Sequence, residues 1–175
     1  MTKAYVMMNC KLGSEKEIIN SLTKIDGVRE AHGTLGLYDI VAKLESDTEE
    51  KIREIVTKTI RKMPKVNSTV TLTRSESGEL FQSSEKLIGM MLGHNDAQAY
   101  VVIHCDKGKE FQTLKNFSHI PEVKEADVVF GFYDVICKLE ASDDTTLENV
   151  ITKAVRLLPN IKTSMTLNII KEQES

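Results

Sequence analysis

The sequence predicts an α+β fold made of two tandem β-α-β-β-α-β units. The first observation is an internal repeat, because Gly36 to Glu45 recurs 95 positions later as Gly131 to Glu140. With this offset, residues 4–73 match their partners at 22 of 70 positions without a gap. The second observation is that each copy alternates between the two-residue period of a strand and the 3.6-residue period of a helix. We therefore interpret the 175 residues as a duplicated domain.

The first unit, residues 1–74, is expected to contain four strands and two helices. The strands are predicted at 4–10, 28–35, 38–45 and 66–73. Ser14 stands three residues before a glutamate, which is the spacing of a capping box at the start of a helix. Ser46 or Asp47 is expected to cap the second helix. This order of elements is the ferredoxin-like arrangement.

The second unit, residues 98–175, repeats the same order. Its strands are predicted at 99–106, 123–130, 133–141 and 161–170. Residues 75–97 form a linker between the units. This linker contains apolar residues such as Leu80, Leu87 and Ile88, which predict a short packed helix rather than a free tether.

A sheet with both helices on one face leaves its other face bare. An apolar set is expected under the helices, namely Tyr38, Ile40, Ala42, Leu44, Val70 and Leu72. A mixed set is expected on the opposite face, namely Asp39, Val41, Lys43, Thr69 and Thr71. Such a half-polar face suits pairing with a second sheet, with a pocket at the seam. We therefore expect an intrachain pseudo-dimer of the dimeric α/β-barrel type.

The composition is ordinary for a globular protein, with 41% hydrophobic and 28% charged residues. No apolar run approaches the roughly 20 residues of a membrane span, so we expect no membrane partner. No signal peptide is apparent, and the three cysteines lack metal-type spacing, so a reducing cytoplasm is expected. Residues 1–74 carry 13 Lys and Arg against 10 Asp and Glu, without a dense basic cluster. We therefore expect no direct contact with nucleic acid.

The repeated turn supplies the candidate functional residues: Gly36, Tyr38 and Asp39 in the first unit, and Gly131, Tyr133 and Asp134 in the second. One interpretation is a plain hairpin whose aspartate supports the turn. The other is a ligand site, in which the carboxylate binds the ammonium of a small zwitterion and backbone amides bind its carboxylate. Glycine permits a positive φ or a close backbone approach at this turn.

No other residues form a catalytic or metal-binding pattern. Cys10, Cys105 and Cys137 are interpreted as buried thiols. His104 beside Cys105 is a weak metal signal, because adjacent strand residues point to opposite faces. The Met7-Met8 and Met90-Met91 pairs are interpreted as core or interface residues. We expect no metal, no cofactor and no enzyme activity.

These motifs resemble the effector-binding domain of Lrp/AsnC (leucine-responsive) regulators, also called the RAM domain. The resemblance is carried by Ile25-Asp26-Gly27-Val28 and Gly36-Leu37-Tyr38-Asp39 in the first copy. In the second copy it is carried by Ile120-Pro121-Glu122-Val123 and Gly131-Phe132-Tyr133-Asp134. Glu122 replaces the glycine of the first copy, so the copies have diverged, and a ligand site at both seams or at one seam are both open expectations.

The resemblance implies a module that forms homo-oligomers and binds an amino acid or a similar small effector between subunits. It carries ligand contact over to the glycine, tyrosine and aspartate of each turn, and more loosely to Thr69, Thr71, Ser164 and Thr166 of the last strands. Lrp/AsnC-type regulators are implied as partners. Those regulators begin with a helix-turn-helix domain, whereas this chain begins at its first strand, so a sensor without a DNA reader is expected.

Two other interpretations stay open. The same topology occurs in small dimeric α/β-barrel enzymes such as monooxygenases, although this chain has no Trp and its His residues are scattered. A structural assembly protein without a ligand would instead fill the seam with side chains.

Overall fold

The computed structural model describes residues 1–74 and 97–174. The chain divides into two compact units: the first contains strands β1 to β4, and the second contains β5 to β7 and β8 as far as Asn168. The short helix expected in the linker lies outside the described residues. Among the described helices, none is long and apolar enough to cross a membrane.

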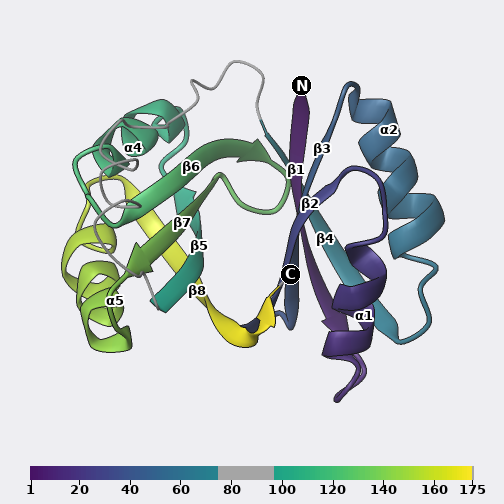
Figure 1. Cartoon of the computed structure of the whole chain (residues 1–175). Helices are drawn as coiled ribbons and strands as arrows, with labels where there is room; N and C mark the ends of the chain where they lie inside the picture. Colours follow the sequence, from purple (N-terminus) through teal and green to yellow (C-terminus); the bar gives the residue numbers. More distant parts are fainter. Residues whose placement is uncertain (75–96, 175) are drawn as a thin grey trace. The chain divides into compact units, whose positions relative to one another are not determined.

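The first unit has the predicted β-α-β-β-α-β order. Its elements are β1 (Thr2–Cys10), α1 (Glu15–Leu22), β2 (Val28–Leu35), β3 (Ile40–Ser46), α2 (Glu49–Glu54), the π-helical continuation η1 (Ile55–Ile60) and β4 (Val66–Arg74). The strands pair antiparallel in the order β4-β1-β3-β2. Figure 1 shows α1 and α2 on one side of these strands.

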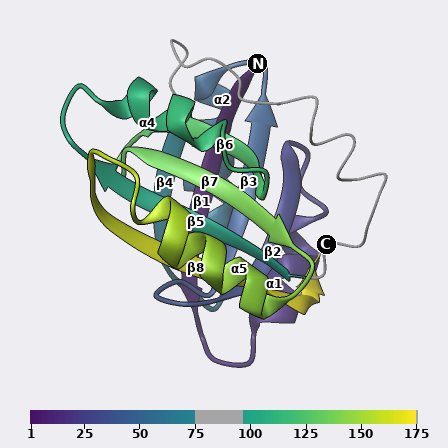
Figure 2. The same ribbon diagram turned by 90° about the vertical axis from the view of Figure 1, so that its left-hand side faces the viewer.

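The second unit repeats this order. Its elements are β5 (Ala97–Cys105), α4 (Glu110–Phe117), β6 (Val123–Phe130), β7 (Val135–Ala141), α5 (Asp144–Val150), η2 (Ile151–Val155) and β8 (Ile161–Glu174). The strands pair antiparallel in the order β8-β5-β7-β6. Figure 2 shows α4 and α5 over one face of the sheet.

The core of the first unit lies between its helices and one face of its sheet. Val6 of β1 pairs with Ala42 of β3, and Met8 pairs with Ile40, so these side chains share a face. They pack in one cluster with apolar residues of the helices, including Ile18, Leu22, Ile52, Val56 and Ile60. Residues 40, 42 and 44 of β3 therefore lie under the helices, as predicted.

The prediction for β4 was wrong in phase. Val6, on the helix face, pairs with Thr71, whereas Met7 and Tyr5, on the other face, pair with Val70 and Leu72. The threonines of β4 therefore point to the helix side and its apolar residues to the other side. Alternation of residue types predicts a strand but does not say which of its two faces meets the helices. Because β4 lies at the end of its unit's strand order, α2 covers it only in part, and half-buried threonines are tolerated there.

The helix caps also differ from the prediction. The Ser14 side chain makes no capping hydrogen bond and instead donates to the Lys11 carbonyl. Thr48, rather than Ser46 or Asp47, caps α2, because its Oγ1 accepts from the Lys51 amide at 3.2 Å. The repeat could have identified this residue, since position 143, which is 95 residues later, holds the Asp that caps α5.

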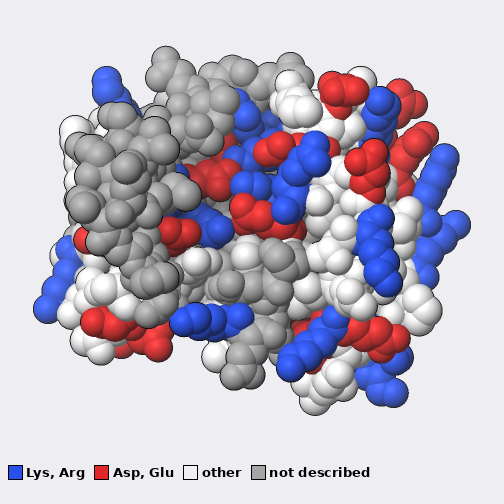
Figure 3. All heavy atoms as spheres, viewed as in Figure 1, with Lys and Arg blue, Asp and Glu red and all other residues white. Residues whose placement is uncertain are grey.

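Charges of both signs lie along α2 and η1. Figure 3 shows Lys and Arg interspersed with Asp and Glu in this region. Three pairs are spaced four residues apart with N–O distances of 3.4 to 3.6 Å, namely Lys51–Asp47, Arg53–Glu49 and Lys58–Glu54. All three pairs are exposed, so each contributes little to stability.

The cap of α2 can be tested by comparing two neighbouring alanine substitutions. Thr48→Ala is expected to lower the free energy of unfolding by about 1 kcal/mol, because it removes the acceptor for the Lys51 amide. Asp47→Ala removes only an exposed ion pair with Lys51 and is expected to change the free energy of unfolding by less than about 0.5 kcal/mol. Urea denaturation measures both values. A larger loss of unfolding free energy for Asp47→Ala than for Thr48→Ala would contradict the assignment of the cap to Thr48.

Candidate functional site

Asp39 ties the repeated turn of the first unit to two neighbouring strands. Its amide donates to the carbonyl of Met8 on β1 at 2.8 Å, and its own carbonyl accepts from the amide of Thr34 on β2 at 2.8 Å. Its carboxylate Oδ2 accepts from the amide of Cys10 at 3.0 Å. The aspartate of the motif is therefore a structural part of the hairpin, whatever else it does.

Asp134 makes the same three hydrogen bonds in the second unit. Its amide donates to Ile103, its carbonyl accepts from Val129, and both distances are 2.9 Å. Its Oδ2 accepts from the amide of Cys105 at 3.0 Å. The repeat thus preserves a backbone arrangement as well as a string of residues.

A β-bulge explains why each unit needs this carboxylate. The register between β1 and β4 shifts between Asn9 and Cys10, and that between β5 and β8 shifts between His104 and Cys105. A bulge disrupts the regular ladder and leaves a backbone group to be satisfied by other means. The aspartate carboxylate supplies the acceptor at that point.

Exposed apolar side chains flank the glycine of each turn. Gly36 has φ 154° and Gly131 has φ 138°, a conformation that favours glycine. On either side of these glycines lie Leu35, Leu37, Phe130 and Phe132, which are 66–68% exposed. Each turn therefore presents two large apolar side chains next to a half-buried aspartate.

The second unit adds an aromatic cluster at its turn. The His104 ring stacks on Tyr133 with centroids 4.6 Å apart, and Phe132 meets Tyr133 edge-on at 5.4 Å. The Asp134 carboxylate lies 3.7 Å from His104 Nδ1. The Tyr133 hydroxyl reaches the sulfur of Met165 at 3.6 Å. This cluster combines an anionic group with aromatic faces.

The first unit lacks this cluster, because other residues occupy the equivalent positions. Asn9 stands in place of His104, Leu37 in place of Phe132 and Val70 in place of Met165. In the sequence, His104 is notable only as a neighbour of Cys105. The signal that could have found the cluster is that the residue before each bulge lies beside the turn that the aspartate anchors.

The structure separates the threonines of the last strands from the turn residues. Thr166 pairs with Val101 and Ser164 pairs with Ile103, and these partners belong to the core under the helices. Met165, which contacts Tyr133, lies on the opposite face. Thr69 and Thr71 share the helix face of the first unit. The five candidate residues of each unit therefore do not form one site.

All three cysteines are buried and free. Burial is the main cause that raises the pKa of the Cys10 and Cys105 thiols above the ordinary value. The nearby Asp39 and Asp134 carboxylates raise these pKa values further, while hydrogen bonds with Ser14 and Thr113 oppose the rise. Among the described residues, no group of three or more His, Cys, Asp or Glu side chains could hold a metal ion.

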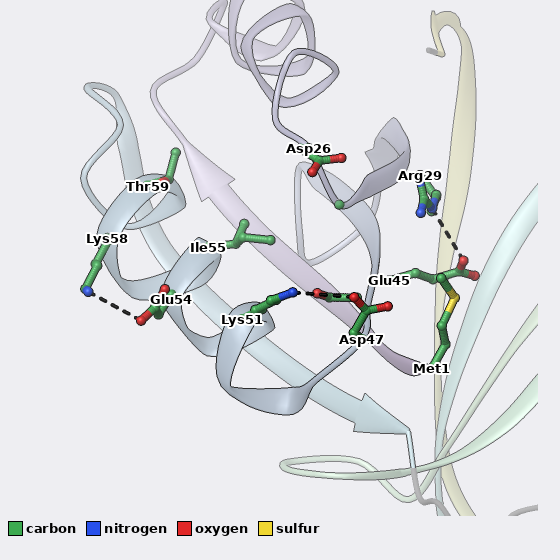
Figure 4. A pocket seen from close by; sticks show the side chains of 12 residues that line it. Met1, Asp26, Arg29, Glu45, Asp47, Lys51, Glu54, Ile55, Lys58 and Thr59 are labelled. Atoms are coloured by element: carbon green, nitrogen blue, oxygen red, sulfur yellow. Dashed lines mark hydrogen bonds and ion pairs between the residues drawn. The ribbon is translucent and has the colours of Figure 1, made fainter.

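A pocket of about 440 Å³ in the first unit was not predicted. Figure 4 shows its charged rim and the side chain of Ile55. Gly27 keeps the space open, because a Cβ at this position would lie 2.9 Å from Ile55 Cδ1, and its φ of +102° favours glycine. The rim groups largely neutralise one another through ion pairs such as Arg29–Glu45 at 3.4 Å. Glu122 occupies the equivalent position of the second unit.

Comparison with known proteins links both units to one family. The sequence model of the Lrp/AsnC ligand binding domain matches residues 3–77 and 98–175. An uncharacterized HTH-type transcriptional regulator of Pyrococcus furiosus is 32% identical over 74 residues, which are 41% of this chain and 49% of that protein. The chain thus spans about half the length of this curated relative. A hypothetical protein of Pyrococcus horikoshii is 33% identical over 43% of this chain and 90% of its own, with a TM-score of 0.42.

Two solved structures match nearly the whole chain. The siroheme decarboxylase NirDL has a TM-score of 0.66 and 9% identity over 95% of this chain and 70% of its own. An anthrone oxidase-like protein has a TM-score of 0.59 and 11% identity over 97% of this chain and 90% of its own. At these identities the likeness shows the fold alone. It confirms the predicted class of tandem ferredoxin-like units of the dimeric α/β-barrel type.

The anchoring role of the aspartates predicts a difference between two substitutions at one position. Asp39→Ala is expected to destabilise the protein by about 1–3 kcal/mol, because the Cys10 amide loses its acceptor. Asp39→Asn is expected to cost less, because the amide oxygen of asparagine can still accept. The same order is expected at Asp134. Urea denaturation measures the differences, and equal losses for Ala and Asn would show that the hydrogen bond is unimportant.

The raised thiol pKa predicts slow alkylation of the folded protein. At about pH 8, Cys10 and Cys105 are expected to react with iodoacetamide more than tenfold more slowly than glutathione, because both thiols are buried and protonated. A raised pKa in the folded state stabilises the fold below the unfolded thiol value of about 8.5, and this contribution is lost as pH rises. Mass spectrometry follows the labelling, and urea-unfolded protein is the control. Rapid labelling of either thiol would contradict the assignment.

Proposed function

Because the chain belongs to the Lrp/AsnC ligand binding domain family, we propose that it is a regulatory module that binds a small effector at its repeated turns. The effector is an amino acid or a similar zwitterion. Its binding alters how the chain associates, either with itself or with DNA-binding relatives. The similarity to a transcriptional regulator supports this regulatory, non-catalytic role.

The observation that carries the proposal is the aspartate of each turn. Asp39 and Asp134 are half-buried, and each uses Oδ2 to hold a backbone amide. The second carboxylate oxygen can accept from the ammonium group of a ligand, and a charge-assisted bond of this kind is among the stronger hydrogen bonds. Because the backbone contacts fix the carboxylate in place, little conformational freedom is lost when a ligand binds.

The apolar residues of the turns support a role in association. Leu35, Leu37, Phe130 and Phe132 make up half of the large hydrophobic side chains that are exposed in the described part of the chain. Clustered exposed apolar residues are typical of binding surfaces, whereas single ones are not informative. An effector bound at Asp39 or Asp134 would lie next to these side chains and could strengthen or weaken contacts made through them.

The two turns are proposed to differ in affinity. In the second unit the carboxylate of Asp134 lies beside the stacked rings of His104 and Tyr133, and Phe132 closes one side. Aromatic faces attract cations and provide apolar contact area. The first unit keeps the tyrosine as Tyr38 but has Asn9 and Leu37 in place of His104 and Phe132. We therefore assign the tighter site to the second unit.

A thermal-shift screen of the twenty amino acids and common nucleotides tests the proposal. A ligand that binds the folded state raises the melting temperature by mass action. At least one amino acid is expected to do so with the wild-type protein. The shift is expected to be largely lost in Asp134→Asn and less affected in Asp39→Asn. Asparagine is preferred to alanine here because it keeps an acceptor for the Cys105 or Cys10 amide.

The control is Thr166→Val, which alters the helix face of the second unit, away from the turn. It is expected to leave the ligand-induced shift unchanged. A shift that survives both asparagine substitutions would contradict the assignment to the turns. If no amino acid or nucleotide raises the melting temperature, the effector proposal fails and a purely structural assembly role is favoured.

A further inference from the structure

A second pocket of the first unit lies on the other flank of α2 and η1 from the one around Gly27. It has a volume of about 310 Å³ and lies between the helix and β4. Glu49, Arg53, Thr57 and Arg61 line it from the helical side, and Thr71 and Thr73 line it from the strand. Ile52 and Val56, both nearly fully buried, provide its apolar part. The volume is at the lower end of the range of small-molecule sites, about 300–1,000 Å³.

One buried hydroxyl group in this pocket has no hydrogen-bond partner among the described residues. Thr71 Oγ1 is buried and has no hydrogen-bond partner in the described part of the chain. A buried hydroxyl without a partner is unfavourable, so it is a candidate for a ligand contact. Thr57 differs, because its hydroxyl already donates to the Arg53 carbonyl at 2.8 Å.

Arg61 provides a cation beside this hydroxyl. Its Nε donates to Thr69 Oγ1 at 3.1 Å, which orients the guanidinium over β4. Within residues 1–74 and 97–174 it makes no ion pair, so its terminal nitrogens are available. Arg53 adds a second guanidinium, and its contact with Glu49 at 3.4 Å is an exposed and therefore weak pair. The two guanidinium groups outweigh the single carboxylate of Glu49, so the lining has a net charge of +1.

We propose that this pocket binds a small oxyanion, either a phosphate or a carboxylate group, free or at one end of a small metabolite. Arg61 and Arg53 supply the charge, since guanidinium groups pair well with planar or tetrahedral oxyanions. The Thr71 hydroxyl donates a hydrogen bond to the anion. Any organic part of the ligand lies against Ile52 and Val56. This site is separate from the turns and lies on the helix face of the sheet.

The second unit offers a natural comparison. It keeps the equivalents of Thr57, Arg61 and Thr71 as Thr152, Arg156 and Thr166, and Thr166 Oγ1 is likewise buried without a partner in the described chain. Glu148 stands where the first unit has Arg53. This carboxylate would repel an anion, so the site is assigned to the first unit alone.

Titration of the full chain with inorganic phosphate, at constant ionic strength, tests the proposal. Isothermal calorimetry gives the affinity, and NMR shifts of the Thr71 and Thr73 amides give the location. Acetate and glycerol phosphate serve as second and third probes, to separate a preference for carboxylate from one for phosphate. Arg61→Gln is expected to weaken binding about tenfold or more, because a charged partner is lost. Arg53→Glu, which copies the second unit, is expected to abolish it.

Thr71→Val distinguishes a ligand contact from a structural role. It is expected to weaken phosphate binding about fivefold while leaving the melting temperature of the free protein unchanged or higher, because it removes an unpaired buried hydroxyl. Arg156→Gln is the matched control and is expected to leave the affinity unchanged. The proposal is overturned if Arg156→Gln weakens binding as much as Arg61→Gln, or if neither phosphate nor acetate shifts the Thr71 amide beyond the effect of sodium chloride.

Discussion

The hydrogen bond from the Cys10 or Cys105 amide, at the register shift, to the aspartate of the turn is the constraint on which each unit depends. At Cys10 and Cys105 the strand leaves its regular register, and the carboxylate of Asp39 or Asp134 completes the hydrogen bonding there. The same aspartate joins its hairpin to the first strand through backbone contacts. The two interpretations of the motif are therefore compatible, since one oxygen holds the turn and the other is available to a ligand.

The duplication has kept this backbone arrangement and changed the side chains around it. Features that require a particular residue type, such as the hydrogen bonds of Asp39 and the positive φ of Gly36, recur in both units. Positions that only line a surface have diverged, as Asn9 and His104 or Arg53 and Glu148 illustrate. Two copies of one scaffold can therefore carry different sites: an aromatic, anionic turn in the second unit and a cationic pocket in the first.

The order of elements was predictable from the sequence because it depends on local periodicity, which the repeat displays twice. The phase of β4 was not, because either face of an alternating Val-Thr strand could meet the helices, and only pairing with Val6 and Met7 decides. Thr48 was missed because adjacent Ser and Asp residues are equally good caps. Neither pocket could be predicted, since each depends on the spacing between elements that are distant in sequence.

The placement of the candidate sites is consistent with the proposal that an effector would act by changing association. Asp39 contacts Met8 and Cys10 of β1, and Thr71 of β4 pairs with Val6 of the same strand, so a strand rather than a hinge separates turn and pocket. A paired central strand is among the more rigid parts of a domain, and coupling between sites requires an element with two arrangements. The exposed leucines and phenylalanines lie at the turns themselves. A ligand bound there, as proposed, would need no transmitted movement to alter an interface, because it would lie beside these exposed side chains.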